Sequence, residues 1–188
     1  MEQTMTVNGR SYRIVRLLGK GKGGYSYLAE DEAGRYTLKQ IHHEPCRYYQ
    51  FGDKLAAELR DYERLRKAGV PVPELLDFDR EQERILKEYV DGETVYDLVL
   101  RDALEPRLYE EMEALAAQLQ AQGLNIDYFP TNFLLREGRL VYVDYECNDY
   151  MEQWDFAHWG RNYWAKTPEF LACAAERGDL PAREEEHP

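Results

Sequence analysis

The chain has 188 residues, and its 24 Lys and Arg against 36 Asp and Glu give a formal net charge of −12. This length suits one compact domain or two small lobes and allows a buried core. The negative charge argues against non-specific binding to nucleic acid and against binding to an anionic membrane surface. No apolar run is long enough to span a membrane and the N-terminus does not resemble a signal peptide, so we expect a cytoplasmic protein.

The first half of the chain predicts an antiparallel sheet with one helix. Runs of β-forming residues alternate with turns rich in glycine and acidic residues. Leucines recur at helical spacing between residues 53 and 68, and Gly69 with the prolines after it ends that helix. The five expected strands are residues 11–18, 25–30, 35–41, 74–78 and 84–90.

The second half predicts a small, mainly helical lobe with one hairpin around the turn 136–139. Pro106 suits the first turn of a helix, and Thr167 suits the cap of the last helix, which ends near Gly178. The expected helices are residues 94–100, 106–122, 154–164 and 167–178. We therefore expect one lobe at 1–90, a second at 91–180 and a disordered acidic tail at 181–188.

The glycine-rich stretch with Gly19, Gly21 and Gly24 lies between two expected strands. Rossmann and P-loop sites need a helix N-terminus behind the phosphate, so this context excludes both. Two interpretations stay open. The stretch is a flexible hairpin tip, or it is a flap whose backbone N–H groups close over phosphate groups.

Lys39 and Glu58 form a candidate pair. A lysine in a strand is usually solvated, and it becomes a phosphate ligand only where an acidic residue fixes it. Glu58 lies between Leu55 and Tyr62 on the apolar face of the expected helix, where a carboxylate needs a partner. That partner is either Lys39 or Lys54, one turn earlier on the same helix.

The most specific candidate site consists of Asp127, Asn132 and Asp144. If the strands of the expected hairpin pair, Asn132 and Asp144 lie side by side at its mouth, with Asp127 on the loop before it. Asp144 follows an apolar run, where an unpaired carboxylate is costly. Oxygen ligands directed at one point suit a hard cation and phosphate chemistry. The alternative is a turn rich in Asx residues.

Asp155 stands in a cluster of large aromatic residues. The aromatic side chains are expected to belong to the core. Asp155 is then expected to be a buried acceptor for backbone amides of its own loop, which is a supporting role.

In chain order these motifs resemble the protein-kinase-like superfamily. Gly19-x-Gly21-x-x-Gly24 resembles its glycine-rich loop, Lys39 and Glu58 its ion pair, and Glu88-Tyr89-Val90 its hinge. Asp127-x-x-x-x-Asn132 resembles the catalytic loop. Asp144-Tyr145-Glu146 is most similar to the aminoglycoside phosphotransferase and choline kinase branch. The likeness runs from about residue 12 to residue 164.

The resemblance implies a two-lobe α+β fold, with a five-stranded antiparallel sheet and one helix in the first lobe and a small helical second lobe. It also implies ATP and Mg²⁺ as cofactors. Lys39, held by Glu58, then binds the α- and β-phosphates, Asn132 and Asp144 hold the metal, and Asp127 orients or deprotonates an acceptor hydroxyl. The other nucleotide-binding residues implied are Gly19, Gly21, Gly24, Glu88 and Val90.

The chain departs from the family pattern at Asn125, Phe129 and Lys87, which replace a histidine, a cationic residue and the usual gatekeeper. Only about two dozen residues follow Trp164, so the resemblance implies a truncated second lobe. Two functions stay open, beside the interpretation that the chain is an acidic α+β domain whose motifs are accidental. One is a kinase that acts on a hydroxyl of a small molecule or protein, favoured by the complete motif set. The other is a nucleotide-binding pseudokinase whose short second lobe binds a partner protein, favoured by Phe129.

Overall fold

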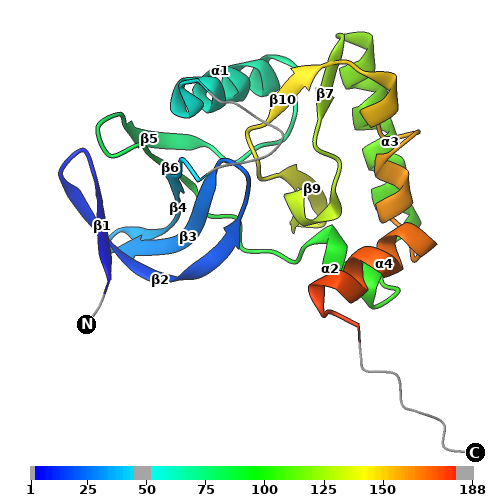
Figure 1. Cartoon of the computed structure of the whole chain (residues 1–188), viewed down its shortest axis with the longest axis horizontal. Helices are drawn as coiled ribbons and strands as arrows, with labels where there is room; N and C mark the ends of the chain where they lie inside the picture. The colour runs from blue at the N-terminus through cyan, green and yellow to red at the C-terminus, as the bar shows by residue number, and fades with distance from the viewer. Residues whose placement is uncertain (1–2, 45–51, 181–188) are drawn as a thin grey trace, which may run out of the picture. The chain divides into compact units, whose positions relative to one another are not determined.

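The computed structural model describes residues 3–44 and 52–180, which form two compact units (Figure 1). The first unit comprises Met1–Asp91 and Val141–Cys147, and the second comprises Gly92–Leu140 and Asn148–Pro188. The segment Val141–Cys147, which was expected in the second lobe, thus belongs to the first unit. The tail at 181–188 lies outside the described residues.

The first unit is built on a six-stranded antiparallel sheet (Figure 1). The strand order is β1-β2-β3-β4-β6-β5, so β4 and β6 lie inside the sheet. The strands are β1 (Thr4–Val7), β2 (Arg10–Lys20), β3 (Gly24–Asp31), β4 (Gly34–Ile41), β5 (Leu75–Asp79) and β6 (Arg84–Glu88).

The expected number of five strands was wrong because β1 was missed. Asn8 and Gly9 have φ angles of 48° and 80°, as the two central residues of a tight hairpin turn require. Asn-Gly is the preferred pair for such a turn, so the signal was present in the sequence. The turn pairs Val7 with Arg10, and Val7 is fully buried in the core of the unit.

Helix α1 (Lys54–Lys67) lies against one face of this sheet (Figure 1). Asp53 caps its N-terminus by accepting a hydrogen bond from the N–H of Ala56 at 2.8 Å. On the opposite face, a second cluster of buried residues surrounds Leu38 and Leu86. The cluster under α1 consists of Leu55, Tyr62, Ile85 and Tyr145.

The second unit is mainly helical. Two further sheets have two strands each, β7 with β10 and β8 with β9, and the end of β9 (Val141 and Tyr142) and the start of β10 (Cys147) are counted with the first unit. Thr94 and Thr167 cap α2 and α4 through their hydroxyl groups, as their place before each apolar run predicts. Within 3–44 and 52–180, no helix is long and apolar enough to cross a membrane. The elements are α2 (Val95–Leu100), α3 (Pro106–Ala121), β7 (Leu124–Ile126), β8 (Phe133–Arg136), β9 (Arg139–Tyr142), β10 (Cys147–Asp149) and α4 (Pro168–Arg177).

The helix expected at 154–164 does not form. Two short 3₁₀ turns, Glu152–Trp154 and Gly160–Tyr163, take its place. Asp155 is buried, and its carboxylate accepts a hydrogen bond from the backbone N–H of His158 at 2.8 Å, which confirms its supporting role. This bond holds the backbone in a loop, because the carboxylate competes with helical hydrogen bonding.

Candidate functional site

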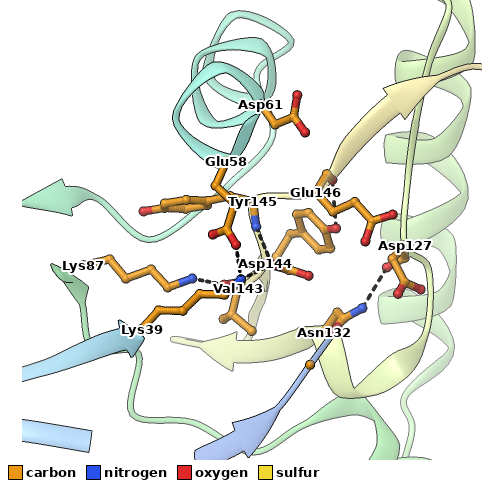
Figure 2. Close-up of polar contacts among 12 residues, drawn as sticks. Lys39, Glu58, Asp61, Lys87, Asp127, Asn132, Val143, Asp144, Tyr145 and Glu146 are labelled. Carbon is orange, nitrogen blue, oxygen red and sulfur yellow. Dashed lines mark hydrogen bonds and ion pairs between the residues drawn. The ribbon is translucent and has the colours of Figure 1, made fainter. Parts of the chain in front are cut away.

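Lys39 and Glu58 form a buried ion pair in the first unit. Lys39 lies on β4, and its Nζ is 2.5 Å from Oε1 of Glu58 on α1 (Figure 2). The same Nζ lies 3.6 Å from Oδ1 of Asp144, which follows β9. Lys54, the alternative partner of Glu58, instead donates to the backbone carbonyl of His42 at 2.6 Å. The structure therefore brings together three of the expected site residues, with the carboxylates of Glu58 and Asp144 beside the ammonium group of Lys39.

The charges of this cluster stabilise one another. Burial opposes the charge of Lys39, but the carboxylates of Glu58 and Asp144 outweigh it and hold the pKa of Lys39 above its ordinary value. Burial likewise favours the neutral form of Asp144, but Lys39 and Lys87 outweigh it and lower the pKa of this carboxyl. Asp144 is thus an ionised, partly buried carboxylate, which can ligate a cation.

The glycine-rich turn between β2 and β3 comes close to this ion pair. The N–H of Gly21 donates to the carbonyl of Gly24 at 2.9 Å and closes the turn. A Cβ added to Gly23 would lie 3.1 Å from Oε1 of Glu58 and 3.6 Å from Nζ of Lys39. Backbone at this tip can therefore approach a group held by Lys39 more closely than a residue with a side chain allows.

Gly24 is needed for the sheet itself. A Cβ added there would lie 2.4 Å from the carbonyl oxygen of Gln40 on β4, which is far inside van der Waals contact. We expect Gly24→Ala to lower the free energy of unfolding by about 1–3 kcal/mol, measured by urea unfolding. Gly19→Ala is the control, because a Cβ there meets nothing within 4 Å. An equal cost for both variants would contradict this steric explanation.

The two expected hinge residues, Glu88 and Val90, lie at and just after the end of β6. Glu88 on β6 pairs with Tyr36 on β4, and the N–H of Glu88 donates to the carbonyl of Glu74 at 2.9 Å. Val90 is buried. Both residues precede the point after Asp91 at which the chain leaves the first unit.

Asp127 and Asn132 lie together on one loop of the second unit. Asp127 follows β7, and the 3₁₀ turn Pro130–Asn132 leads into β8. The side-chain amide of Asn132 donates to the backbone carbonyl of Asp127 at 3.3 Å (Figure 2). Oδ1 of Asp127 accepts a hydrogen bond from the N–H of Phe129 at 3.0 Å. The loop is thus fixed by its own polar groups.

Aromatic residues support this loop. The indole N–H of Trp164, which is almost fully buried, donates to the carbonyl of Tyr128 at 2.8 Å. The ring of Phe129 packs edge-on against Tyr163, with the two centroids 5.2 Å apart. Asn125 is buried and donates through its amide to the carbonyl of Met151 at 3.3 Å. The residues that depart from the family pattern therefore have packing and hydrogen-bonding roles here.

Residues 14–126 match the model of the phosphotransferase enzyme family, which is more than half of the chain. The chain belongs to this family. A protein of Archaeoglobus fulgidus named probable serine/threonine-protein kinase BUD32 homolog is 35% identical to this chain over 81 residues, which are 43% of this chain and 38% of the relative. KEOPS complex subunit Bud32 of Pyrococcus abyssi is 28% identical over 145 residues, or 70% of this chain and 66% of the relative.

The chain thus spans less than two thirds of the length of both relatives. A solved kinase domain, that of PknI from Mycobacterium tuberculosis, has a TM-score of 0.46 and 25% identity, covering 75% of this chain and 60% of that one. The family match and the two Bud32 relatives confirm a member of the protein-kinase-like superfamily. The chain has the kinase-like two-lobe α+β fold and belongs with the kinase-type phosphotransferases.

The position of the Lys87 ammonium was not predicted from the sequence. Lys87 on β6 is buried, and its Nζ donates to the carbonyl of Val143 at 2.7 Å. The same Nζ lies 4.3 Å from the centroid of the Tyr145 ring (Figure 2). A lysine inside the apolar run of β6 was the available signal, because a charge there needs a buried partner.

Lys87 also makes the free energy of unfolding depend on pH. Burial, followed by the charge of Lys39, lowers the pKa of Lys87 to about 8 from an ordinary value of 10.5. Asp144 and Glu58 face the same ammonium and oppose this shift. Between these two pH values the unfolded chain binds more protons than the folded chain, so the free energy of unfolding rises with pH.

We expect the free energy of unfolding of the parent chain to rise by about 1.5 kcal/mol relative to that of Lys87→Met between about pH 8 and about pH 9.5. Urea unfolding of both proteins at closely spaced pH values measures this difference. The methionine variant cannot bind the proton, so its curve isolates the other titrating groups. Parallel curves would mean that Lys87 keeps an ordinary pKa in the folded protein.

Proposed function

We propose that this chain transfers the γ-phosphoryl group of ATP, with Mg²⁺, to a hydroxyl group of a small molecule or protein. The observation that carries the proposal is the buried Lys39–Glu58 pair, with the ionised Asp144 at 3.6 Å from the same ammonium. Kinase-type reactions need a lysine held by a helix glutamate and an aspartate for the metal. Burying charged groups in this way costs free energy of folding. A role for these charges in the reaction accounts for that cost.

The first unit serves as the nucleotide-binding lobe in this proposal. Lys39, oriented by Glu58, binds the α- and β-phosphates, while the backbone of the glycine-rich loop at Gly19, Gly21 and Gly24 covers them. Backbone groups at the hinge residues Glu88 and Val90 contact the adenine. ATP as co-substrate also implies a cytoplasmic location.

Asp144 and Asn132 are the proposed ligands of Mg²⁺. A carboxylate and an amide oxygen are hard donors, and the lowered pKa of Asp144 keeps its carboxylate ionised at neutral pH. In the part of the chain that the structure describes, no group of three or more His, Cys, Asp or Glu could hold a metal ion by itself. This fits Mg²⁺, which is usually bound by one or two protein groups together with substrate phosphates.

Asp127 is the proposed catalytic residue. The acceptor hydroxyl oxygen forms a bond to the γ-phosphorus as the bond to the β-phosphate oxygen breaks, and ADP leaves. Asp127 orients the hydroxyl and takes its proton. Its backbone carbonyl is held by Asn132 and its Oδ1 by the N–H of Phe129, so its position on the loop is fixed before the substrate binds.

A second candidate function is a nucleotide-binding pseudokinase that binds a partner protein. Phe129, two residues after Asp127, packs against Tyr163 and supplies no positive charge to a transferring phosphoryl group. The relative from Pyrococcus abyssi is named as a subunit of the KEOPS complex, which favours a protein partner. Turnover, argued in the Discussion, distinguishes the two functions.

Nucleotide binding tests both candidates. ATP with Mg²⁺ at about 100 times its Kd should stabilise the fold by about 2.7 kcal/mol and raise the Tm. We expect Asp144→Ala to remove the Mg²⁺-dependent part of this rise and to keep the part seen in EDTA. Asp77→Ala is the control, since Asp77 on β5 accepts a hydrogen bond from the side chain of Asn8 at 2.8 Å. No shift with ATP or GTP, with or without Mg²⁺, would exclude both functions.

A further inference from the structure

Lys87 lies on the same face of the sheet as the Lys39–Glu58 pair. Lys39 on β4 is directly opposite Ile85 on β6, and Lys87 is two residues further along that strand. Because side chains two residues apart in a strand point to the same side, both lysines lie on the face that carries α1. Two buried ammonium groups thus share one face of the first unit.

This arrangement needs a physical explanation. A buried ammonium group is costly, and the charge of Lys39 increases the cost at Lys87. A methionine would fill a similar volume without either penalty. The charge of Lys87 is compensated by the carbonyl of Val143 at 2.7 Å and by the face of the Tyr145 ring at 4.3 Å.

Both compensating groups are neighbours of Asp144 in the chain. Val143 precedes it, and Tyr145 follows it. Tyr145 is itself fixed, because its hydroxyl donates to the carbonyl of Pro73 at 2.8 Å and its N–H donates to Oδ1 of Asp144 at 2.8 Å. Lys87 therefore contacts the chain on both sides of the carboxylate (Figure 2).

We propose that Lys87 is a positioning residue for Asp144. By binding Val143 and Tyr145 it holds the backbone on both sides, so that the Asp144 carboxylate stays beside Lys39 in the orientation that ligates Mg²⁺. This proposal rests on the metal-binding role proposed for Asp144. Lys87 itself touches neither nucleotide nor metal in this proposal, and it acts through the backbone of the segment 143–145.

The test uses the full chain with Lys87→Met and, as a matched control, Lys54→Met. Lys54 is also buried, and its ammonium also donates to a backbone carbonyl, that of His42. The first measurement is the Kd of the ATP analogue AMP-PNP in EDTA and in Mg²⁺. The second is amide hydrogen exchange of the peptide that contains residues 143–145, measured without nucleotide.

We expect the Kd of Lys87→Met in EDTA to stay within about twofold of the parental value. The gain in affinity that Mg²⁺ provides should fall roughly tenfold. Exchange of the peptide should become about tenfold faster. Lys54→Met should change neither the Mg²⁺ gain nor that exchange rate. Lys87→Arg, which keeps the charge, should recover most of the Mg²⁺ gain. A lysine that only fills space would lower the Tm without changing the ratio of the two Kd values.

Each result decides one proposal. Parental exchange in Lys87→Met, or a parental Mg²⁺ gain, would overturn the positioning role while leaving the proposed function intact. If the parent chain shows no Mg²⁺-dependent binding, the proposed function fails. The exchange measurement then still decides whether Lys87 holds residues 143–145: faster exchange in Lys87→Met supports this contact, and parental exchange overturns it. If Lys87→Met does not fold, Tyr145→Leu removes the ring contact, and parental values of both measurements in that variant would overturn the proposal.

Discussion

We expect Asp127→Asn to lower ATP turnover by about 10²–10⁴-fold and to leave ATP binding unchanged within about twofold. The substitution removes the ability to accept a proton and little else. In the parent chain Oδ1 of Asp127 accepts a hydrogen bond from the N–H of Phe129 at 3.0 Å, and an asparagine Oδ1 can still accept this bond. Asn132 donates to the backbone carbonyl of residue 127, so that contact does not depend on the side chain.

Release of ADP at saturating Mg²⁺ and ATP measures turnover, with and without added alcohol acceptors, and a thermal shift measures binding. Asp97→Asn in α2 is the control, because Asp97 has a helix-capping contact with Thr94. A variant that turns over ATP like the parent would show that Asp127 is not the base. A parent that binds ATP and releases no more ADP than Asp127→Asn would favour the pseudokinase.

The Lys39–Glu58 pair shows what a sequence can predict about such a site. Glu58 lies on the apolar face of a strongly periodic helix, and a carboxylate on that face needs a cation. The motif order then pointed to Lys39, although Lys54 was nearer in the chain. The choice between them depended on where the sheet places Lys39 relative to α1, which is a tertiary property.

Two elements of the fold were predicted wrongly, each for an identifiable reason. The strand β1 was missed although Asn8 and Gly9 form the turn that Asn-Gly favours, because the run before this turn has only 4 residues. The loop at 154–164 was read as a helix because its aromatic residues suggest a packed face. The hydrogen bond from the N–H of His158 to Asp155 instead stabilises a loop, and local polar bonds of this kind override periodicity.

The sequence indicates that Lys87 needs a buried partner, but it does not indicate which groups those partners are. Its carbonyl acceptor, Val143, and its aromatic partner, Tyr145, are more than fifty residues away in the chain. Nothing local indicates that the segment Val141–Cys147 belongs to the first unit. Residue type and spacing predicted Asp144 as a site residue, whereas its supporting groups depend on the tertiary fold.

Breaking the buried ion pair should be the most destabilising change at the site. Glu58→Leu leaves Lys39 buried with only Asp144 at 3.6 Å, and we expect it to lower the free energy of unfolding by about 3–5 kcal/mol. Lys39→Met should cost a similar amount, because Glu58 is then a buried carboxylate without its cation. The double variant should be more stable than either single variant, since it leaves neither partner of the pair buried alone.

Urea unfolding of the four proteins gives this double-mutant cycle. The control is the exposed pair Lys20 and Glu44, whose Nζ and Oε2 are 2.6 Å apart with both side chains about half exposed, and its removal should change stability little. Every variant that lacks Lys39 should also lose nucleotide affinity, even where the double variant regains stability. Additive costs in the cycle, or single variants as mild as those at Lys20, would mean that the pair contributes no more than a surface contact. Recovery of stability without recovery of binding would instead separate the two roles of Lys39, because hydrophobic residues can replace the pair in the core but cannot replace an ammonium that binds phosphate.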